Sequence, residues 1–245
     1  ISEQDLLNTA DNRTRVLAVS QVSFYTGQNL DIQALAKGLA GSETLLAVDA
    51  THASGVIDVP AEVTDLCVSS CYKWLLGPHG TAPCYLSEKA EHLARATTFG
   101  WRNLDVWPAQ GAERTFPVAE FQMPEKLEPG NPAMAIIMFL EESLGLLLDV
   151  GIERIEKHAL DLSQMIDQGL EDLGLKVITP SERQQRSGNT CFLDSNAEAT
   201  RKRLEKENVL IWGEYGRMRA SGHLYNSSGD VTRLLDALET THHQN

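Results

Sequence analysis

The chain has 245 residues, a formal net charge of −13 and 42% hydrophobic residues, a balance typical of a soluble globular protein. The negative charge argues against nucleic-acid binding, because a polyanion would be repelled by most of the surface. No apolar run approaches the ~18 residues that a membrane span requires, so we expect no membrane partner. We expect the four cysteines to be reduced and predict a cytoplasmic location.

The first hundred residues alternate short apolar runs with a helical pattern. The patterns predict strands at 14–20, 44–48, 66–69 and 81–86, and a helix at 30–39 between the first two. Strand, helix and strand at this spacing are typical of a βαβ unit. We therefore predict an α/β fold with a mainly parallel sheet.

The pattern changes in the second half of the chain. Five of the nine prolines fall between 97 and 132, so we predict an irregular crossing there. Apolar residues then recur every three or four positions over 152–173, which predicts a long helix. Further patterns predict strands at 175–178, 189–193, 209–212 and 217–220 and helices at 197–205 and 230–238. We divide the chain into a large domain, 1–130, and a second part, 131–245, formed by the long linking helix and a small α+β domain.

Asp49 and Lys73 follow two of the predicted strands directly. Ligands of open parallel sheets bind at the carboxyl ends of strands, so both side chains are expected in one crevice. One interpretation is a structural ion pair. The other is a pyridoxal phosphate site, in which the lysine holds the cofactor aldehyde as a Schiff base and the aspartate keeps the pyridine nitrogen protonated.

Four motifs in order along the chain resemble those of the class V aminotransferase family. They are VDATH at 48–52 with SSCYKWLLGP at 69–78, SQVSFYTG at 20–27, EPGNP at 128–132 and RMRASGHLYN at 217–226. The family consists of fold type I pyridoxal phosphate enzymes and includes cysteine desulfurases, selenocysteine lyases and kynureninases. The resemblance implies pyridoxal 5'-phosphate as the cofactor, an amino acid as the substrate and a homodimer as the assembly.

The resemblance also implies roles for three residues of the first motif. Lys73 would form the Schiff base and move the proton at the substrate α-carbon, which requires its amine to lose a proton. Asp49 would pair with the pyridinium nitrogen. His52 would approach the phenolic oxygen of the cofactor, where family members carry Gln or His.

Four further residues would hold the phosphate and the substrate. Ser70 and Tyr72 would bind the phosphate, and Asn131 stands where relatives often have a Thr that reaches the phosphate of the other subunit. Arg219 would bind the substrate carboxylate in a bidentate pair, which suits its planar guanidinium.

The sequence departs from the family at two places. The large domain of the family begins well before this chain does, so we expect an N-terminal part, with a phosphate-binding turn and a stacking aromatic, to be missing from it. The segment 209–216 also carries no cysteine where desulfurases of the selenocysteine-lyase type have a reactive one. Transamination, racemisation or β-elimination (carbon–sulfur cleavage included) is therefore predicted in place of sulfur relay. The alternative is a truncated, non-catalytic relative that keeps the fold for dimerisation or protein binding.

Overall fold

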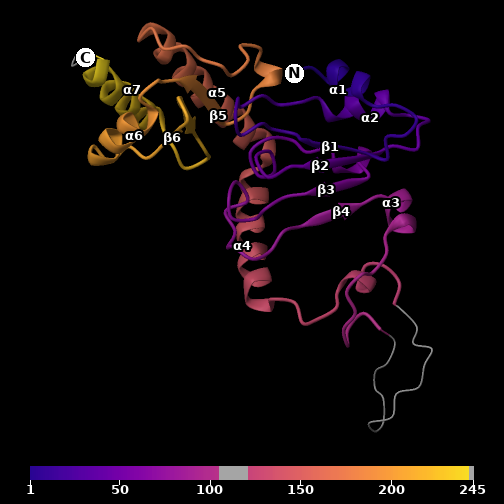
Figure 1. The fold of residues 1–245 in the computed structure, drawn as a ribbon. Helices are drawn as coiled ribbons and strands as arrows, with labels where there is room; N and C mark the ends of the chain where they lie inside the picture. The colour runs from indigo at the N-terminus through magenta and orange to yellow at the C-terminus, as the bar shows by residue number, and fades with distance from the viewer. Residues whose placement is uncertain (105–120, 243–245) are drawn as a thin grey trace.

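The computed structural model describes residues 1–104 and 121–242, the side chains of 241 and 242 excepted. A four-stranded sheet in the order β1-β2-β3-β4 forms the larger part (Figure 1). The strands β1 (Val16–Ser20), β2 (Leu45–Asp49) and β3 (Leu66–Val68) are parallel, and β4 (Cys84–Leu86) adds antiparallel to β3. The prediction of an α/β fold with a mainly parallel sheet is confirmed.

The register of the parallel strands sets the position of the candidate site. Ser20 at the end of β1 lies opposite Asp49 at the end of β2, and Asp49 lies opposite Val68 at the end of β3. The carboxyl ends of three strands therefore meet at one edge of the sheet. Leu46 and Val48 of β2 are buried and alternate with less buried residues, which is the pattern of a strand with one covered face.

Short helices accompany this sheet. Helix α2 (Ile32–Gly38) follows the first strand as predicted, and its N-terminus is capped by the Asp31 side chain. Helix α1 (Glu3–Thr9), which the sequence reading did not predict, begins at a Ser2 capping box. The other short elements are helix α3 (Glu88–Leu93) and 3-10 turns at Ala61–Val63, Glu125–Leu127 and Arg183–Gln185. The predicted irregular crossing is without strands over 97–104 and 121–132, and its remaining residues, 105–120, lie outside the described part.

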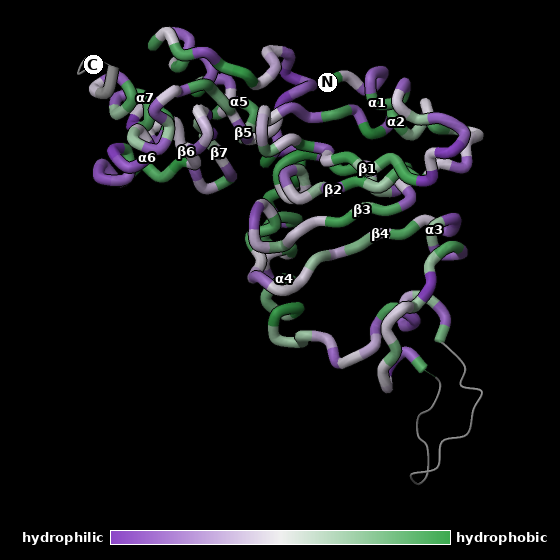
Figure 2. Tube along the Cα trace, viewed as in Figure 1, coloured by the Kyte–Doolittle hydropathy of each residue, from purple (hydrophilic) through white to green (hydrophobic). Residues whose placement is uncertain are grey.

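Two long helices connect the two parts of the molecule. Helix α4 (Met134–Val150) ends at Gly151, whose φ of 90° turns the chain into α5 (Ile152–Asp172), the long helix predicted from the periodicity. The core around the large sheet includes Ile155 and Ala159 of α5. The core of the small domain begins at Leu162 on the same helix. Figure 2 shows the apolar strands of the large sheet and the apolar helix α4 in green. Among the described helices, none combines the length and apolar character needed to cross a bilayer.

The small domain lies to one side of the large sheet, in orange and yellow in Figure 1. Its antiparallel sheet has the order β5-β7-β6, from β5 (Asn189–Leu193), β6 (Trp212–Glu214) and β7 (Arg217–Ser221). Two helices, α6 (Ala197–Lys206) and α7 (Ser228–His242), complete it.

Two predicted strands of this domain are wrong. The segment 175–178 makes a single bridge, Val177 with Phe192, because the N–H of Leu175 bonds the carbonyl of Leu170 in α5 and the N–H of Cys191 bonds the Thr179 hydroxyl. The strand predicted at 209–212 begins only at Trp212. The hairpin turn at Tyr215 and Gly216, both with positive φ, fixes which residues of β6 and β7 pair.

Candidate active site

Asp49 places a carboxylate at the edge where the parallel strands end. Its side chain is exposed and accepts a hydrogen bond of 2.9 Å from the backbone N–H of Thr51. The Thr51 hydroxyl accepts a second bond, of 3.0 Å, from the N–H of Ser70. These bonds join the loop after β2 to the loop after β3, so the motif segments 48–52 and 69–78 are adjacent in space.

Lys73 lies in the loop after β3 and faces His52 from the loop after β2. Its Nζ is 3.0 Å from His52 Nε2. Burial lowers the pKa of Lys73, the positive charge of Arg219 lowers it further, and Asp49 opposes both effects. A lysine in this environment holds a proton less tightly than an exposed one.

His52 is the centre of the cluster. Burial, followed by the charges of Lys73 and Arg219, lowers the pKa of His52 to about 4, and Asp49 acts in the opposite direction. Its other ring nitrogen, Nδ1, is 3.4 Å from Trp74 Nε1 and 3.3 Å from Asn189 Nδ2. The imidazole is therefore neutral near pH 7 and has polar neighbours at both nitrogens.

Arg219 reaches the site from β7 of the small domain. Its Nη1 donates to the backbone carbonyl of Phe24 at 3.3 Å, and its guanidinium carbon lies 5.6 Å from the centre of the Trp212 ring. Burial lowers its pKa, although an arginine stays charged at neutral pH. Its buried Nε has no hydrogen-bond partner among the described residues.

The other predicted site residues are less closely tied to this cluster. Ser70 is joined to it through its backbone N–H. The Tyr72 ring is exposed and stacks on His79 with 4.0 Å between ring centres, while Lys73 Nζ is 5.8 Å from the Tyr72 ring centre. Asn131 is exposed in the segment before α4, and in the described part of the chain its side chain makes no hydrogen bond. The structure thus brings Asp49, His52, Lys73 and Arg219 together and leaves Asn131 outside.

Two residues of the cluster were missed by sequence reasoning. Asn189, fully buried on β5, belongs to no motif and lies 137 positions from His52 in sequence. Trp74 was assigned to the core or an interface; it is buried, yet its indole N–H also reaches His52. The position of Trp74 next to Lys73 in the sequence was the one feature that could have indicated a role in the site.

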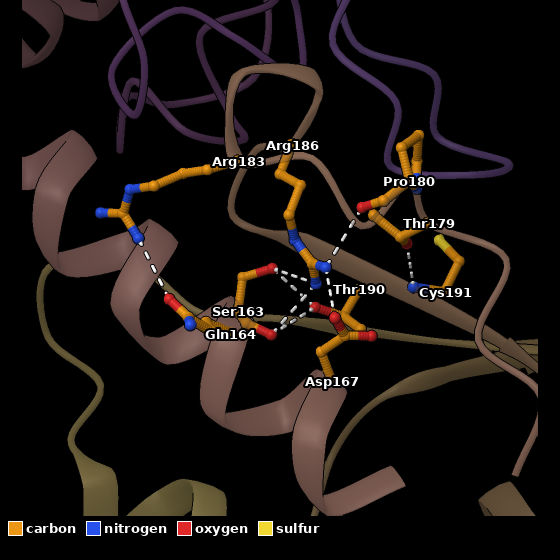
Figure 3. Close-up of polar contacts among 9 residues, drawn as sticks. All are labelled: Ser163, Gln164, Asp167, Thr179, Pro180, Arg183, Arg186, Thr190 and Cys191. Atoms are coloured by element: carbon orange, nitrogen blue, oxygen red, sulfur yellow. Dashed lines mark hydrogen bonds and ion pairs between the residues drawn. The ribbon is translucent and has the colours of Figure 1, made fainter. Parts of the chain in front are cut away.

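A buried arginine holds the segment that leads into β5 (Figure 3). Arg186 pairs with Asp167 of α5, and its guanidinium also donates to the carbonyls of Pro180 and Ser163, both at 3.2 Å. The next residue, Ser187, donates to the carbonyl of Gly27 in the large domain at 3.4 Å. Helix α5 therefore anchors the loop that carries Asn189 to the site. Among the described residues, no group of three or more His, Cys, Asp or Glu side chains could hold a metal ion.

Comparison with known proteins decides the family. The family model for aminotransferase class-V matches residues 1–234. The chain belongs to the class V aminotransferase family. The resemblance inferred from the four motifs is thereby confirmed.

This class V aminotransferase chain is similar to curated proteins of several names. It is 28% identical over 256 residues to a probable cysteine desulfurase of Pseudomonas putida, with 98% of this chain and 61% of that protein covered. It is 29% identical over 268 residues to a kynureninase of Monosiga brevicollis, with 97% and 55% covered. An uncharacterized protein of Schizosaccharomyces pombe is 26% identical over 238 residues, with 93% and 53% covered. The chain therefore spans little more than half the length of these relatives.

Solved structures show the same fold. A cysteine desulfurase from Thermococcus onnurineus aligns with a TM-score of 0.87 at 21% identity, covering 98% of this chain and 63% of that one. The cystine C-S lyase C-DES, in complex with cysteine persulfide, aligns with a TM-score of 0.85 at 20% identity, covering 97% and 64%. At these identities the likeness establishes the fold of this class V aminotransferase chain and leaves its reaction open.

Proposed function

We propose that this chain belongs to a pyridoxal 5'-phosphate-dependent enzyme that acts on an amino acid, with Lys73 as the residue that binds the cofactor covalently. The observation that carries the proposal is the Lys73 amine 3.0 Å from His52, in the electrostatic field of both Asp49 and Arg219. Family membership supports it, since the resemblance to class V enzymes implies this cofactor.

The residues present fit the cofactor. Asp49 is an exposed carboxylate with a single hydrogen bond to it among the described residues, so its second oxygen remains available to pair with a ring N–H. Lys73 has a lowered pKa, so a larger fraction of its amine is nucleophilic at neutral pH. When bound, pyridoxal phosphate supplies an electron sink for the bonds at the substrate α-carbon.

Each residue has a distinct task in this proposal. The Asp49 carboxylate stabilises a proton on the pyridine nitrogen. The Lys73 amine binds the aldehyde and later holds the α-proton of the substrate. His52, neutral and half-buried, directs its Nε2 toward the Lys73 amine and would contact the phenolic oxygen of the cofactor. Ser70, Tyr72 and Asn131 remain candidates for phosphate contacts.

Arg219 is the candidate for the substrate carboxylate. Its one hydrogen bond to a protein carbonyl leaves other guanidinium N–H groups to bind a carboxylate in two-point fashion. The neighbouring Arg217 donates to the carbonyl of Tyr25 and lies 4.0 Å from the centre of that residue's ring. Both arginines stack over the Trp212 ring, but only Arg219 is among the charges that act on His52 and Lys73, which makes Arg217 a suitable control.

For the reaction, we propose transamination, racemisation or β-elimination in place of sulfur relay. The tight turn at Tyr215 and Gly216 joins β6 directly to β7, so no long loop stands between the segment 209–216 and the arginine motif. Of the four cysteines, Cys84 is exposed, while Cys67, Cys71 and Cys191 are buried. A thiolate that accepts sulfur must be accessible, and Cys84 lies on the edge strand of the large sheet, not in this hairpin.

Absorbance spectroscopy tests the cofactor assignment. Incubation with pyridoxal 5'-phosphate followed by desalting should leave a visible-range band that Lys73→Ala abolishes and that the exposed-lysine variant Lys202→Ala retains. Borohydride reduction and peptide mapping should place the cofactor mass on Lys73. A colourless protein would favour the alternative of a non-catalytic relative that serves dimerisation or protein binding.

Arg219→Ala tests the substrate site. With alanine, cysteine and kynurenine as trial substrates, loss of a hydrogen-bonded charge worth about 1.5–3 kcal/mol should raise KM about 10- to 150-fold. Arg217→Ala should change KM much less. Equal KM values for Arg219→Ala and the unmodified chain would remove this arginine from the site.

We also propose that the protein is a homodimer that uses α4. Two large apolar side chains of this helix, Met138 and Phe139, are 63% and 68% exposed. Large apolar side chains are normally buried, and exposed ones often mark the interface with a partner subunit. Light scattering coupled to gel filtration should give twice the chain mass, and Phe139→Glu should shift it to the monomer. Leu210→Glu, at an exposed leucine of the small domain, is the matched control.

A further inference from the structure

The hydrogen bonds around His52 fix where its proton is. Trp74 presents an indole N–H to His52 Nδ1, and an indole nitrogen can donate but cannot accept. Nδ1 must therefore carry a lone pair and no proton. In the neutral ring the single proton is then on Nε2, the nitrogen that faces Lys73.

Asn189 reinforces this arrangement from the small domain. Because Nδ1 is an acceptor, the amide of Asn189 must turn its NH2 group toward it, at 3.3 Å. The Asn189 carbonyl oxygen then accepts from the Ser221 hydroxyl at 2.7 Å. Both groups are held by strands β5 and β7, and Asn189 is completely buried, so the amide has one orientation that satisfies all its partners.

The position of the His52 proton affects the charge of the Lys73 amine. A proton on His52 Nε2 points at Lys73 Nζ over 3.0 Å, and a protonated amine has no lone pair to accept it. Two donors facing each other repel, whereas an uncharged amine accepts the bond. We propose that Asn189 is a positioning residue that fixes His52 with its proton on Nε2 and thereby keeps the Lys73 amine uncharged.

The charged groups around the pair act in opposite directions. Arg219 and Asp49 are the charges that influence both residues, and a positive charge on Lys73 would itself lower the pKa of His52. Arg219 disfavours a second positive charge, and Asp49 favours one. The tautomer therefore adds a hydrogen-bond effect in the same direction as burial and the charge of Arg219, against that of Asp49. The importance of an uncharged amine for catalysis rests on the proposed function, whereas the tautomer and the charge are properties of the chain itself.

Nitrogen NMR of the cofactor-free chain with ¹⁵N-labelled histidine tests the tautomer directly. His52→Gln identifies the His52 signals among the seven histidines. The expected result is an unprotonated Nδ1 and a protonated Nε2 between pH 6 and 8. A proton on Nδ1 overturns the proposal. In Asn189→Asp the carboxylate can only accept and so favours a proton on Nδ1, against the Trp74 N–H, and the fraction of His52 with its proton on Nδ1 should rise.

Competitive acetylation with mass spectrometry measures the charge of Lys73 against the exposed Lys202. Replacing Asn189 by leucine, which has a similar size and no donor, should lower the labelling rate of Lys73 at fixed pH about threefold to tenfold, the worth of one hydrogen bond. Arg183→Met, which removes an exposed ion pair of the same segment and contacts neither Asn189 nor His52, should leave the rate unchanged. Equal slowing in both variants, or none in Asn189→Leu, overturns the proposal.

The two readouts separate this inference from the proposed function. If the chain binds no pyridoxal phosphate but His52 carries its proton on Nε2, the proposed function fails and the inference stands. If the chain binds the cofactor on Lys73 but the tautomer is the other one, the inference alone fails. Should Asn189→Leu not fold, the tautomer of the unmodified chain still decides.

Discussion

The buried ion pair of Arg186 offers the sharpest test of how the candidate site is supported. The Arg186 side chain is 4% exposed and that of Asp167 is 18% exposed. Removing one partner of such a pair leaves an uncompensated buried charge, which typically destabilises a protein by about 3–5 kcal/mol. We expect Arg186→Met to lower the free energy of unfolding by that amount, since it also removes the donor to the Pro180 carbonyl and one of the donors to the Ser163 carbonyl.

Arg183, three residues earlier, is a matched control. It also pairs with an aspartate of α5, Asp161, but the two side chains are 42% and 45% exposed. Exposed pairs are worth about 0–1 kcal/mol because water screens them and the long side chains lose freedom. Arg183→Met should therefore be nearly neutral. The double variant Arg186→Met/Asp167→Leu should recover part of the stability, because both buried charges are then gone.

Urea unfolding monitored by circular dichroism measures these differences, with the slope of the transition checked for two-state behaviour. The loop held by Arg186 leads into Asn189, so the single variant should also broaden the His52 nitrogen signals. The different effects expected for Arg186→Met and Arg183→Met rest only on the different burial of the two ion pairs. If Arg186→Met and Arg183→Met lie within about 1 kcal/mol of each other, the reasoning from burial is refuted.

Two further predictions concern the junction of the domains and the pH response. Gly27 has a φ of +72°, and an added Cβ would lie 2.5 Å from the Asn189 carbonyl oxygen. Gly27→Ala should therefore lower the free energy of unfolding in urea by about 2–4 kcal/mol. The control Gly41→Ala, where φ is +79° and the space is open, should lower it by about 1–2 kcal/mol. The pKa of His52 falls from 6.5 in the unfolded chain to about 4 in the folded one, so the unfolded state binds more protons between these values. Stability should therefore decrease as the pH falls from 6.5 to 4, and His52→Gln should reduce that slope; an unchanged slope would contradict the shift.

The edge of the sheet that carries the candidate site could be predicted from sequence because its position depends on local features. Short apolar runs followed at once by Asp49 or by the loop of Lys73 indicate strand ends, and parallel strands end at the same edge of a sheet. The observed register, with Ser20, Asp49 and Val68 in line, follows from that rule. The resemblance to a known family added the assignment of each residue.

Contacts between distant segments could not be predicted in the same way. The hydrogen bond from Asn189 to His52 joins residues 137 positions apart, and no periodicity or charge pattern links them. The strand predicted at 209–212 was misplaced for a related reason. Its apolar residues satisfy the strand pattern, but the turn at Tyr215 and Gly216 determines which of them can pair with β7.

The C-terminal motif contributes to the site from two directions. Arg219 of β7 contacts the turn at Phe24, while His223, four residues later, is buried beneath Trp74. The backbone N–H of Leu224 donates to His223 Nδ1 at 2.6 Å, so its proton is on Nε2, which donates to the Trp74 carbonyl at 2.8 Å.

The two rings of Trp74 and His223 also stack, with 5.1 Å between their centres. Since Trp74 donates in turn to His52, the small domain fixes both donors that determine the His52 tautomer, one through Asn189 and one through His223. A rotation of the small domain away from the sheet would weaken both contacts together. If the proposed role of the His52 tautomer is right, His223→Leu, which removes the support of Trp74, should slow Lys73 acetylation in the same direction as Asn189→Leu.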